Sequence, residues 1–263
     1  FLERAKQLLK PNGIAAIILP STVLQKNEGV YFNARKLLLE SFDIIAIFEA
    51  GSGTFGKTGT TTDTLFLRKK TSKVNLLNHY TNRVEAWYKD DFNKDEVFDD
   101  DDKLESFADL LGKSIDDVLE DTNLKERLVY YLLAESQEND VQIIKTPTNA
   151  TEIKKYLGYE WSNRKGSEGI QYLSGDIQTI ETPLFNPADY EDDSKINKAI
   201  RQNFLNDTIE NENVKTARLS SLISWNNEVF DLAININKAQ QPITFELKPG
   251  EKLVSLGDSS YSN

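Results

Sequence analysis

Apolar positions in residues 1–70 follow two different spacings. In residues 1–9 and 30–39 they recur every three or four positions, which predicts two amphipathic helices. Residues 14–19 and 44–48 are apolar throughout, which is typical of strands buried on both faces. Residues 60–67 are rich in threonine and predict a third strand. This alternation predicts a doubly wound α/β layer, whose last two strands pair antiparallel as a hairpin at the sheet edge.

The loop between those last two strands matches two nucleotide-binding patterns. Residues 51–56 spell G-x-G-x-x-G, and residues 51–58 spell G-x-x-x-x-G-K-T. Both patterns need a helix next, because the phosphate sits on the N-terminus of that helix. The residues that follow, 59–67, are poor helix formers and good strand formers. We therefore interpret the loop as a flexible connection and keep a P-loop-type NTPase as an alternative.

The middle of the chain predicts an acidic helical segment. A strand is expected at residues 74–77, and the aromatic residues that follow alternate with Arg83 and Lys89 in the sequence. These aromatic residues form either a nucleic-acid stacking surface or part of the hydrophobic core, and we favour the core. Helical spacing then recurs three times, with Ser114 and Thr122 as candidate N-caps. The aromatic residues are Tyr80, Trp87, Tyr88 and Phe92, and the three helical stretches are residues 104–111, 115–119 and 124–133.

The last third of the chain is mixed. Residues 141–144 predict a linker or an edge strand, and residues 158–170 predict an exposed polar loop that carries Arg164 and Lys165. Further expected elements are a short helix at 151–157, a turn-rich stretch at 173–187, a helix at 196–204, helical or mixed stretches at 217–223 and 230–236, and a linker at 243–256.

Composition limits the chemistry. The 263 residues contain no Cys and one His, which argues against thiolate or multi-histidine metal sites and a histidine-centred triad. The sequence contains no run of eighteen apolar residues, and it therefore predicts no membrane span. The net charge of −11 is uneven: residues 85–140 carry 19 acidic and 6 basic residues, a local −13 that leaves +2 for the remainder. The total charge therefore does not exclude a DNA-facing surface.

Several segments together resemble a known family. These are residues 1–24, 34–55 and 60–70, with Leu19-Pro20 after the buried strand and Gly53-Thr54-Phe55 before the threonine-rich strand, and the later block 157–170. They resemble the C-terminal half of the catalytic domain of adenine-specific (N-6) DNA methyltransferases, especially the methylation subunit of type I restriction–modification systems and related fused methylases. The resemblance covers about half of the chain.

This resemblance implies a reaction and a set of residues. The fold would be the back portion of a Rossmann-like class I methyltransferase sheet, which transfers a methyl group from S-adenosylmethionine to the exocyclic amine of adenine in duplex DNA after base flipping. Phe55 would stack on the flipped adenine, or else fold under the hairpin as a minor core residue. We assign DNA contacts to the following residues: Gly53, Thr54, Lys57, Arg164 and Lys165.

The family's glycine-rich cofactor motif and Asn-Pro-Pro-aromatic motif do not occur in these residues. We expect both upstream, so no catalytic residue is assigned here, the cofactor contacts are unknown, and this portion alone should be inactive. Expected partners are double-stranded DNA and specificity and restriction subunits or a fused target recognition domain, with no membrane, in the cytoplasm of a bacterium or archaeon.

The resemblance also suggests a division of the chain. Residues 1–80 would be the back half of the catalytic domain, 81–145 an acidic helical segment, 146–240 a mixed region, and 241–263 a linker or the start of a target recognition domain. A non-catalytic interaction module on a methyltransferase scaffold is a further alternative.

Overall fold

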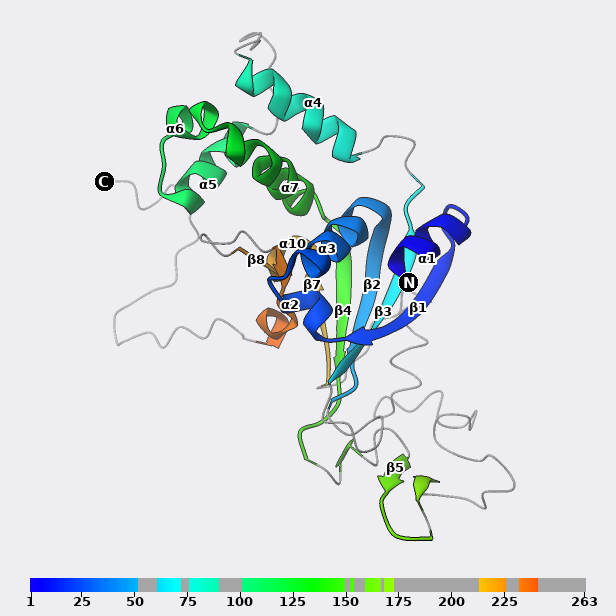
Figure 1. Cartoon of the computed structure of the whole chain (residues 1–263). Helices are drawn as coiled ribbons and strands as arrows, with labels where there is room; N and C mark the ends of the chain where they lie inside the picture. The colour runs from blue at the N-terminus through cyan, green and yellow to red at the C-terminus, as the bar shows by residue number, and fades with distance from the viewer. Residues whose placement is uncertain are drawn as a thin grey trace, which may run out of the picture.

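The computed structural model describes residues 1–51, 61–71, 76–89, 101–149, 152–153, 159–166, 168–172, 213–225 and 232–240. Its centre is a mixed sheet of five strands in the order β1-β3-β2-β4-β7 (Figure 1). The strands are β1 Ile14–Pro20, β2 Phe42–Glu49, β3 Thr62–Lys69, β4 Asp140–Lys145 and β7 Val214–Arg218. The molecule is therefore a mixed α/β fold, as the alternating spacings predict.

The order of the strands corrects two expectations. β2 and β3 do form an antiparallel hairpin, but β3 lies between β1 and β2 and not at the edge of the sheet. β4, expected as a linker or an edge strand, lies between β2 and β7 and runs parallel to β2. Its residues Val141 and Ile143 are buried in the main core cluster, and Ile144 is buried in a smaller cluster on the opposite face of the sheet. The chain thus returns to the same sheet after the acidic helices.

One face of the sheet is covered by the first helices: α1 Leu2–Leu8, α2 Thr22–Gln25 and α3 Gly29–Ser41 (Figure 1). Leu38 and Leu39 of α3 are fully buried against the strands in the main hydrophobic core. Arg35 is also fully buried, and its guanidinium donates to the carbonyls of Val23 at 2.7 Å and Lys26 at 2.9 Å. These two bonds fasten the end of α2 to α3 and hold the segment that follows β1.

β1 departs from the prediction that both of its faces are buried. Its burial alternates residue by residue, and Ile14 and Ile18 remain 46% and 56% exposed. The continuous apolar run fits a strand covered on both faces. Only alternate residues of β1, such as Ile17 and Leu19, are partly buried, and they pack against the main core.

The acidic segment forms helices α4 Leu76–Tyr88, α5 Asp101–Leu111, α6 Ile115–Glu120 and α7 Lys125–Glu135. The expected strand at residues 74–77 is wrong where described, because α4 begins at Leu76. Tyr80 and Trp87 are buried on α4, which confirms the core interpretation for them. Ser114 caps α6 in a full capping box, as predicted, whereas Asp121 and not Thr122 caps the short 3₁₀ helix η1 Thr122–Leu124.

Small elements complete the described structure: β5 Tyr159–Ser162, β6 Gly169–Tyr172, α10 Leu219–Leu222, β8 Ile223–Ser224, β9 Ala233–Ile234 and the 3₁₀ helix η3 Ile236–Gln240. The block expected as an exposed loop is a β5–β6 hairpin with an exposed turn. Of the helix expected at 151–157, residues 152–153 are described and helical. The stretches 173–187, 196–204 and 243–256, and Phe92, lie outside the described residues.

Candidate functional site at the carboxyl ends of the parallel strands

Three strands end side by side at one edge of the sheet. β1 and β2 each run antiparallel to β3, and β4 runs parallel to β2, so β1, β2 and β4 point the same way. Their last residues are Pro20, Glu49 and Lys145. Ligands of open α/β sheets bind outside the carboxyl ends of such strands. The end of the sheet at which β1, β2 and β4 terminate is therefore the candidate functional site, and it is called the candidate edge below. The chain also passes from β2 to β3 there.

A row of side chains crosses the sheet at this edge. Leu19, Asp63, Glu49 and Lys145 are successive partners in the strand register. Directly opposed residues point to the same face of a sheet, so two carboxyl groups lie next to each other with a lysine beyond them. Lys145 Nζ lies 3.0 Å from Glu49 Oε2 and donates to Asn237 Oδ1 at 2.6 Å. The lysine therefore forms its ion pair with Glu49 and none with Asp63.

Asp63 is the most unusual group in this row, since its side chain is only 2% exposed. Burial raises the pKa of Asp63 to about 6; the nearby Ser21 hydroxyl and Lys145 oppose this shift, and the charge of Glu49 adds to it. The Ser21 hydroxyl is close enough to act on the carboxyl, but neither Ser21 Oγ nor Asp63 Oδ1 has a well-formed hydrogen bond to a described residue. A buried carboxyl oxygen without a donor is costly. It can change its protonation when the surroundings of this edge change.

Backbone bonds hold the base of the β2–β3 connection. The amide of Ala50 donates to the carbonyl of Thr62 at 3.1 Å, and that of Thr146 donates to the carbonyl of Glu49 at 3.3 Å. Gly51 has φ +72°, and a Cβ added to it would lie 2.8 Å from Thr146 Oγ1. Only glycine fits this position without strain. The chain therefore leaves β2 in a fixed direction.

The structure separates the predicted site residues into two groups. Gly53, Thr54, Phe55 and Lys57 lie outside the described residues. Arg164 and Lys165 are exposed in the turn of the β5–β6 hairpin, and are not part of the row at the sheet edge.

Sequence reasoning missed the residues of that row. For Asp63 a signal existed, because it is the single charged residue in the threonine-rich stretch of residues 58–67. Glu49 and Lys145 follow apolar runs and gave no comparable signal, since only the parallel pairing of β2 with β4 brings them together.

The phosphate-binding patterns at 51–58 do not have the context that they need. β3 begins at Thr62, so a strand and not a helix follows the glycine-rich stretch. A phosphate-binding loop relies on the N-terminus of the next helix. The arrangement strand–loop–strand thus argues against the NTPase alternative.

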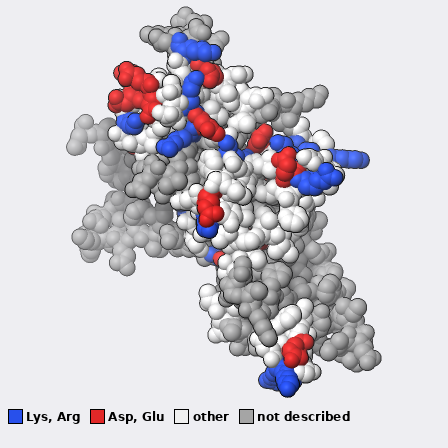
Figure 2. All heavy atoms as spheres, in the orientation of Figure 1, with Lys and Arg blue, Asp and Glu red and all other residues white. Residues whose placement is uncertain are grey.

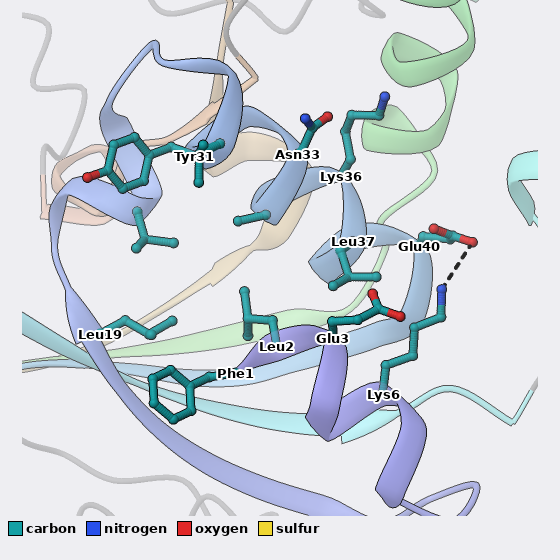
Figure 3. A pocket seen from close by; sticks show the side chains of 13 residues that line it. Phe1, Leu2, Glu3, Lys6, Leu19, Tyr31, Asn33, Lys36, Leu37 and Glu40 are labelled. Carbon is teal, nitrogen blue, oxygen red and sulfur yellow. Dashed lines mark ion pairs between the residues drawn. The ribbon is translucent and has the colours of Figure 1, made fainter.

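A second candidate, a hollow of about 580 Å³, lies between α1 and α3 (Figure 3). Apolar side chains such as Leu2, Leu19 and Leu37 line it, and the ion pair between Lys6 Nζ and Glu40 Oε1, at 3.7 Å, lies at its rim. These groups provide apolar contact and little chemistry. In the described part of the chain, no three His, Cys, Asp or Glu side chains gather as a metal site. Nor is any helix there long and apolar enough to span a bilayer.

Comparison with known proteins identifies the class. The sequence model of the N-6 DNA methylase family matches residues 1–143, and the chain belongs to this family. The matched region contains β1, β2, β3 and part of β4, and thus most of the candidate edge.

One solved structure with some similarity is "a modification subunit of a putative type I restriction enzyme from Vibrio vulnificus YJ016". It is 10% identical, with a TM-score of 0.39, over 87% of this chain and 28% of that chain. The chain therefore spans less than a third of the length of that subunit. None of the curated proteins matches the chain.

Proposed function

We propose that this chain is part of a DNA adenine methyltransferase of a restriction–modification system. The complete enzyme transfers a methyl group to the exocyclic amine of adenine in duplex DNA, after the base has been flipped out of the helix. The observation that carries the proposal is the family match over residues 1–143, which includes the strands that end at the candidate edge. In this proposal β1 to β4 are the back portion of a class I methyltransferase sheet.

S-adenosylmethionine is the methyl donor, and it supplies an activated methyl group on a positively charged sulfonium. The carboxyl groups of Glu49 and Asp63 make the described edge rich in acceptors, and Asp63 Oδ1 still lacks a donor. This fits a ligand that carries positive charge and N–H groups. The described residues form no glycine-rich turn before a helix that could hold the cofactor's carboxylate or adenosine. We therefore place the main cofactor contacts and the Asn-Pro-Pro-aromatic motif outside residues 1–263.

The loop between β2 and β3 carries the proposed contacts to the target base. Phe55 stacks on the flipped adenine, and the glycines on either side of it, Gly53 and Gly56, let the ring approach the base closely. Gly53 and Thr54 contact the DNA. Lys57 contacts backbone phosphate, as do Arg164 and Lys165 on the hairpin. Gly51, fixed against Thr146, sets the direction in which this loop leaves β2.

The assembly and its location follow from the same proposal. Partners would be double-stranded DNA and specificity and restriction subunits, or a target recognition domain fused after residue 240, in the cytoplasm of a bacterium or archaeon. This proposal includes the division of the chain into segments 1–80, 81–145, 146–240 and 241–263. The strand β4, at the boundary of the second and third segments, belongs to the same sheet as the strands of the first segment.

Substitution of Phe55 tests the proposal in the complete enzyme. We expect Phe55→Ala to lower turnover at least tenfold while the melting temperature barely moves, because base–aromatic stacking is worth about 1–3 kcal/mol per base. Phe55→Tyr, which keeps the ring, should retain most of the turnover. Transfer of a labelled methyl group, and the fluorescence of 2-aminopurine at the target position, are the measurements.

The opposite pattern would remove Phe55 from the site. If Phe55 is a core residue, its truncation lowers stability by about 3–5 kcal/mol and leaves turnover normal at low temperature. A complete protein that folds but methylates no DNA would instead support the non-catalytic module. ATP hydrolysis that disappears in Lys57→Ala would support the NTPase.

A further inference from the structure

The β5–β6 hairpin is a well-defined element with an unusual surface. Trp161 pairs with Ile170 across the two strands, and Ser162 pairs with Gly169 next to the turn. The turn is held by its own residues: the amide of Arg164 donates to Ser162 Oγ at 3.3 Å, and that of Gly166 donates to Glu168 Oε2 at 3.0 Å. Gly166 and Gly169 take φ values of +84° and +126°, which favour glycine. The hairpin thus presents its side chains in a fixed arrangement.

Its apolar face is open. Trp161 is 40% exposed and its cross-strand partner Ile170 is 48% exposed. Neither belongs to a core cluster of the described residues. A two-stranded hairpin is marginal in water, and exposing a tryptophan and an isoleucine on it sacrifices burial that would stabilise it. A contiguous apolar pair on such an element is typical of a contact surface.

Two basic groups that form no ion pair lie beside that apolar face, in a turn that also carries Glu168. Arg164 and Lys165 are exposed at the turn, and they form no ion pair with a described residue. On the body of the molecule, by contrast, Lys36 and Lys145 are paired with Glu126 and Glu49, each at 3.0 Å. Figure 2 shows basic atoms at the extreme end of the molecule, with acidic atoms next to them, where Figure 1 places β5. The turn is therefore available to a polyanion.

The hairpin also lies at the functional end of the sheet. In Figure 1 it is drawn beyond the ends of β2 and β4 that carry Glu49 and Lys145, and away from the helices α4 to α7. A DNA duplex at the candidate edge would extend well past the flipped base. It could reach the hairpin on the same side of the molecule.

We propose that the β5–β6 hairpin is a DNA-contacting element in which Trp161 stacks on a base that has lost its neighbour, while Arg164 and Lys165 bind backbone phosphates. The inference rests on the proposed function for its partner. Ile170 supports one side of the indole and keeps it in place. Stacking of this kind tolerates any base, because every base has a π-face. The hairpin therefore adds affinity for opened DNA without reading sequence.

Binding by the complete enzyme tests this, with fluorescein-labelled duplexes that are intact or contain one abasic site. We expect Trp161→Ala to weaken binding to the abasic duplex roughly tenfold, and to the intact duplex less, whereas Trp161→Phe keeps most of the affinity. The double variant Arg164→Ala/Lys165→Ala should weaken both duplexes alike. It should also flatten the slope of log K against log salt by about 2, since each phosphate contact contributes about 0.9.

Two controls match these changes. Ile115→Ala removes another exposed apolar side chain, on α6, and Lys215→Ala removes another exposed lysine, on β7; both should bind as the wild type does. Tryptophan fluorescence gives an independent readout, because DNA should quench a component that is present in the wild type and missing in Trp161→Phe. Circular dichroism establishes that each variant is folded.

The outcomes separate the two proposals. If the wild type methylates DNA and the hairpin variants bind both duplexes unchanged, the hairpin inference is overturned and the methyltransferase proposal stands; that pattern points to a protein partner for the apolar face. If the wild type binds the duplexes with the expected dependence on Trp161 but transfers no methyl group, the hairpin inference stands and the proposed function fails.

Discussion

At the scale of single residues, Asp63 combines burial with an unfilled hydrogen-bonding capacity. Most buried polar atoms in proteins have a partner, so a buried carboxyl oxygen without one at the carboxyl ends of the strands calls for an explanation. Its neighbours explain the missing compensation. Lys145 is engaged by Glu49 and Asn237, and Ser21 is not placed to donate a well-formed bond.

The raised pKa of Asp63 predicts a definite dependence of stability on pH. Between about pH 4 and pH 6 the folded chain holds a proton on Asp63 that the unfolded chain has released, so stability falls as the pH rises through this window. Because a tenfold change in proton affinity is worth about 1.4 kcal/mol, the loss at neutral pH is at most about 3 kcal/mol. The substitution Asp63→Asn removes this pH-dependent loss of stability. Urea denaturation should show the variant gaining stability over the wild type as the pH rises from 4 to 7, by up to that amount.

The matched control for this experiment is Asp109→Asn, which replaces an exposed carboxyl on α5. The stability gained by Asp63→Asn over the wild type should rise with pH by more than that of Asp109→Asn. If it does not, the pKa of Asp63 is not raised.

Gly51 predicts a stability effect at the base of the β2–β3 loop. Gly51→Ala should lower stability by about 1–3 kcal/mol, since alanine is strained at φ +72° and its Cβ would approach Thr146 Oγ1 at 2.8 Å. Gly29→Ala is the control, because a Cβ there meets nothing within 4 Å and alanine favours the helix. Thermal unfolding measures both variants.

A second substitution separates the two causes at Gly51. Thr146→Ala removes the oxygen that the new Cβ would meet. The double variant should regain only part of the lost stability, because the backbone strain stays. Full recovery would show that φ at this position is not constrained.

At the scale of elements, periodicity predicted the helices and strands of the first seventy residues. Residues 14–19 and 44–48 formed strands because continuous apolar runs cannot bury all their side chains on a helix that faces solvent. Ser114 was predictable as a cap from its type and from Asp117 three positions later. The sequence does carry a signal for α4, because Leu77, Tyr80, Val84 and Trp87 recur at helical spacing. The short apolar run at residues 74–77, considered alone, favours a strand.

What the sequence could not supply was the pairing between elements. Local patterns predicted the β2–β3 hairpin, but the insertion of β3 between β1 and β2 depends on contacts of β1 that no local pattern encodes. Residues 141–144 are only a short apolar run, and their place beside β2 follows from parallel pairing across the whole helical segment. The row of Asp63, Glu49 and Lys145 depends on the β2–β3 hairpin and also on this parallel pairing, which no local pattern encodes. It was therefore out of reach of sequence reasoning.

At the scale of the whole molecule, the acidic helices and the hairpin lie at opposite ends. Figures 1 and 2 place α5 and α6, with their exposed acidic side chains, at one end and the hairpin, where basic and acidic atoms lie together, at the other. Electrostatic fields in physiological salt decay over about 8 Å, so the acidic end does not repel a duplex bound at the other. A chain with a net charge of −11 can therefore contact DNA through a local basic surface.

The same view of the whole molecule predicts that residues 1–263 alone do not bind S-adenosylmethionine, the cofactor of the proposed enzyme. Ligands of α/β sheets bind where a strand is followed by a glycine-rich turn and a helix, near the point where strand order reverses. The glycine-rich stretch at 51–56 is followed by β3, and in the described sheet β1, β2 and β4 are not followed by such a turn. We therefore expect residues 1–263 alone to show no heat of S-adenosylmethionine binding at micromolar concentration in titration calorimetry. The complete enzyme, titrated under the same conditions, is the control and should bind. Micromolar binding by the 263 residues alone would place the cofactor on this chain's own edge, where the orphaned Asp63 Oδ1 would be the first acceptor to examine.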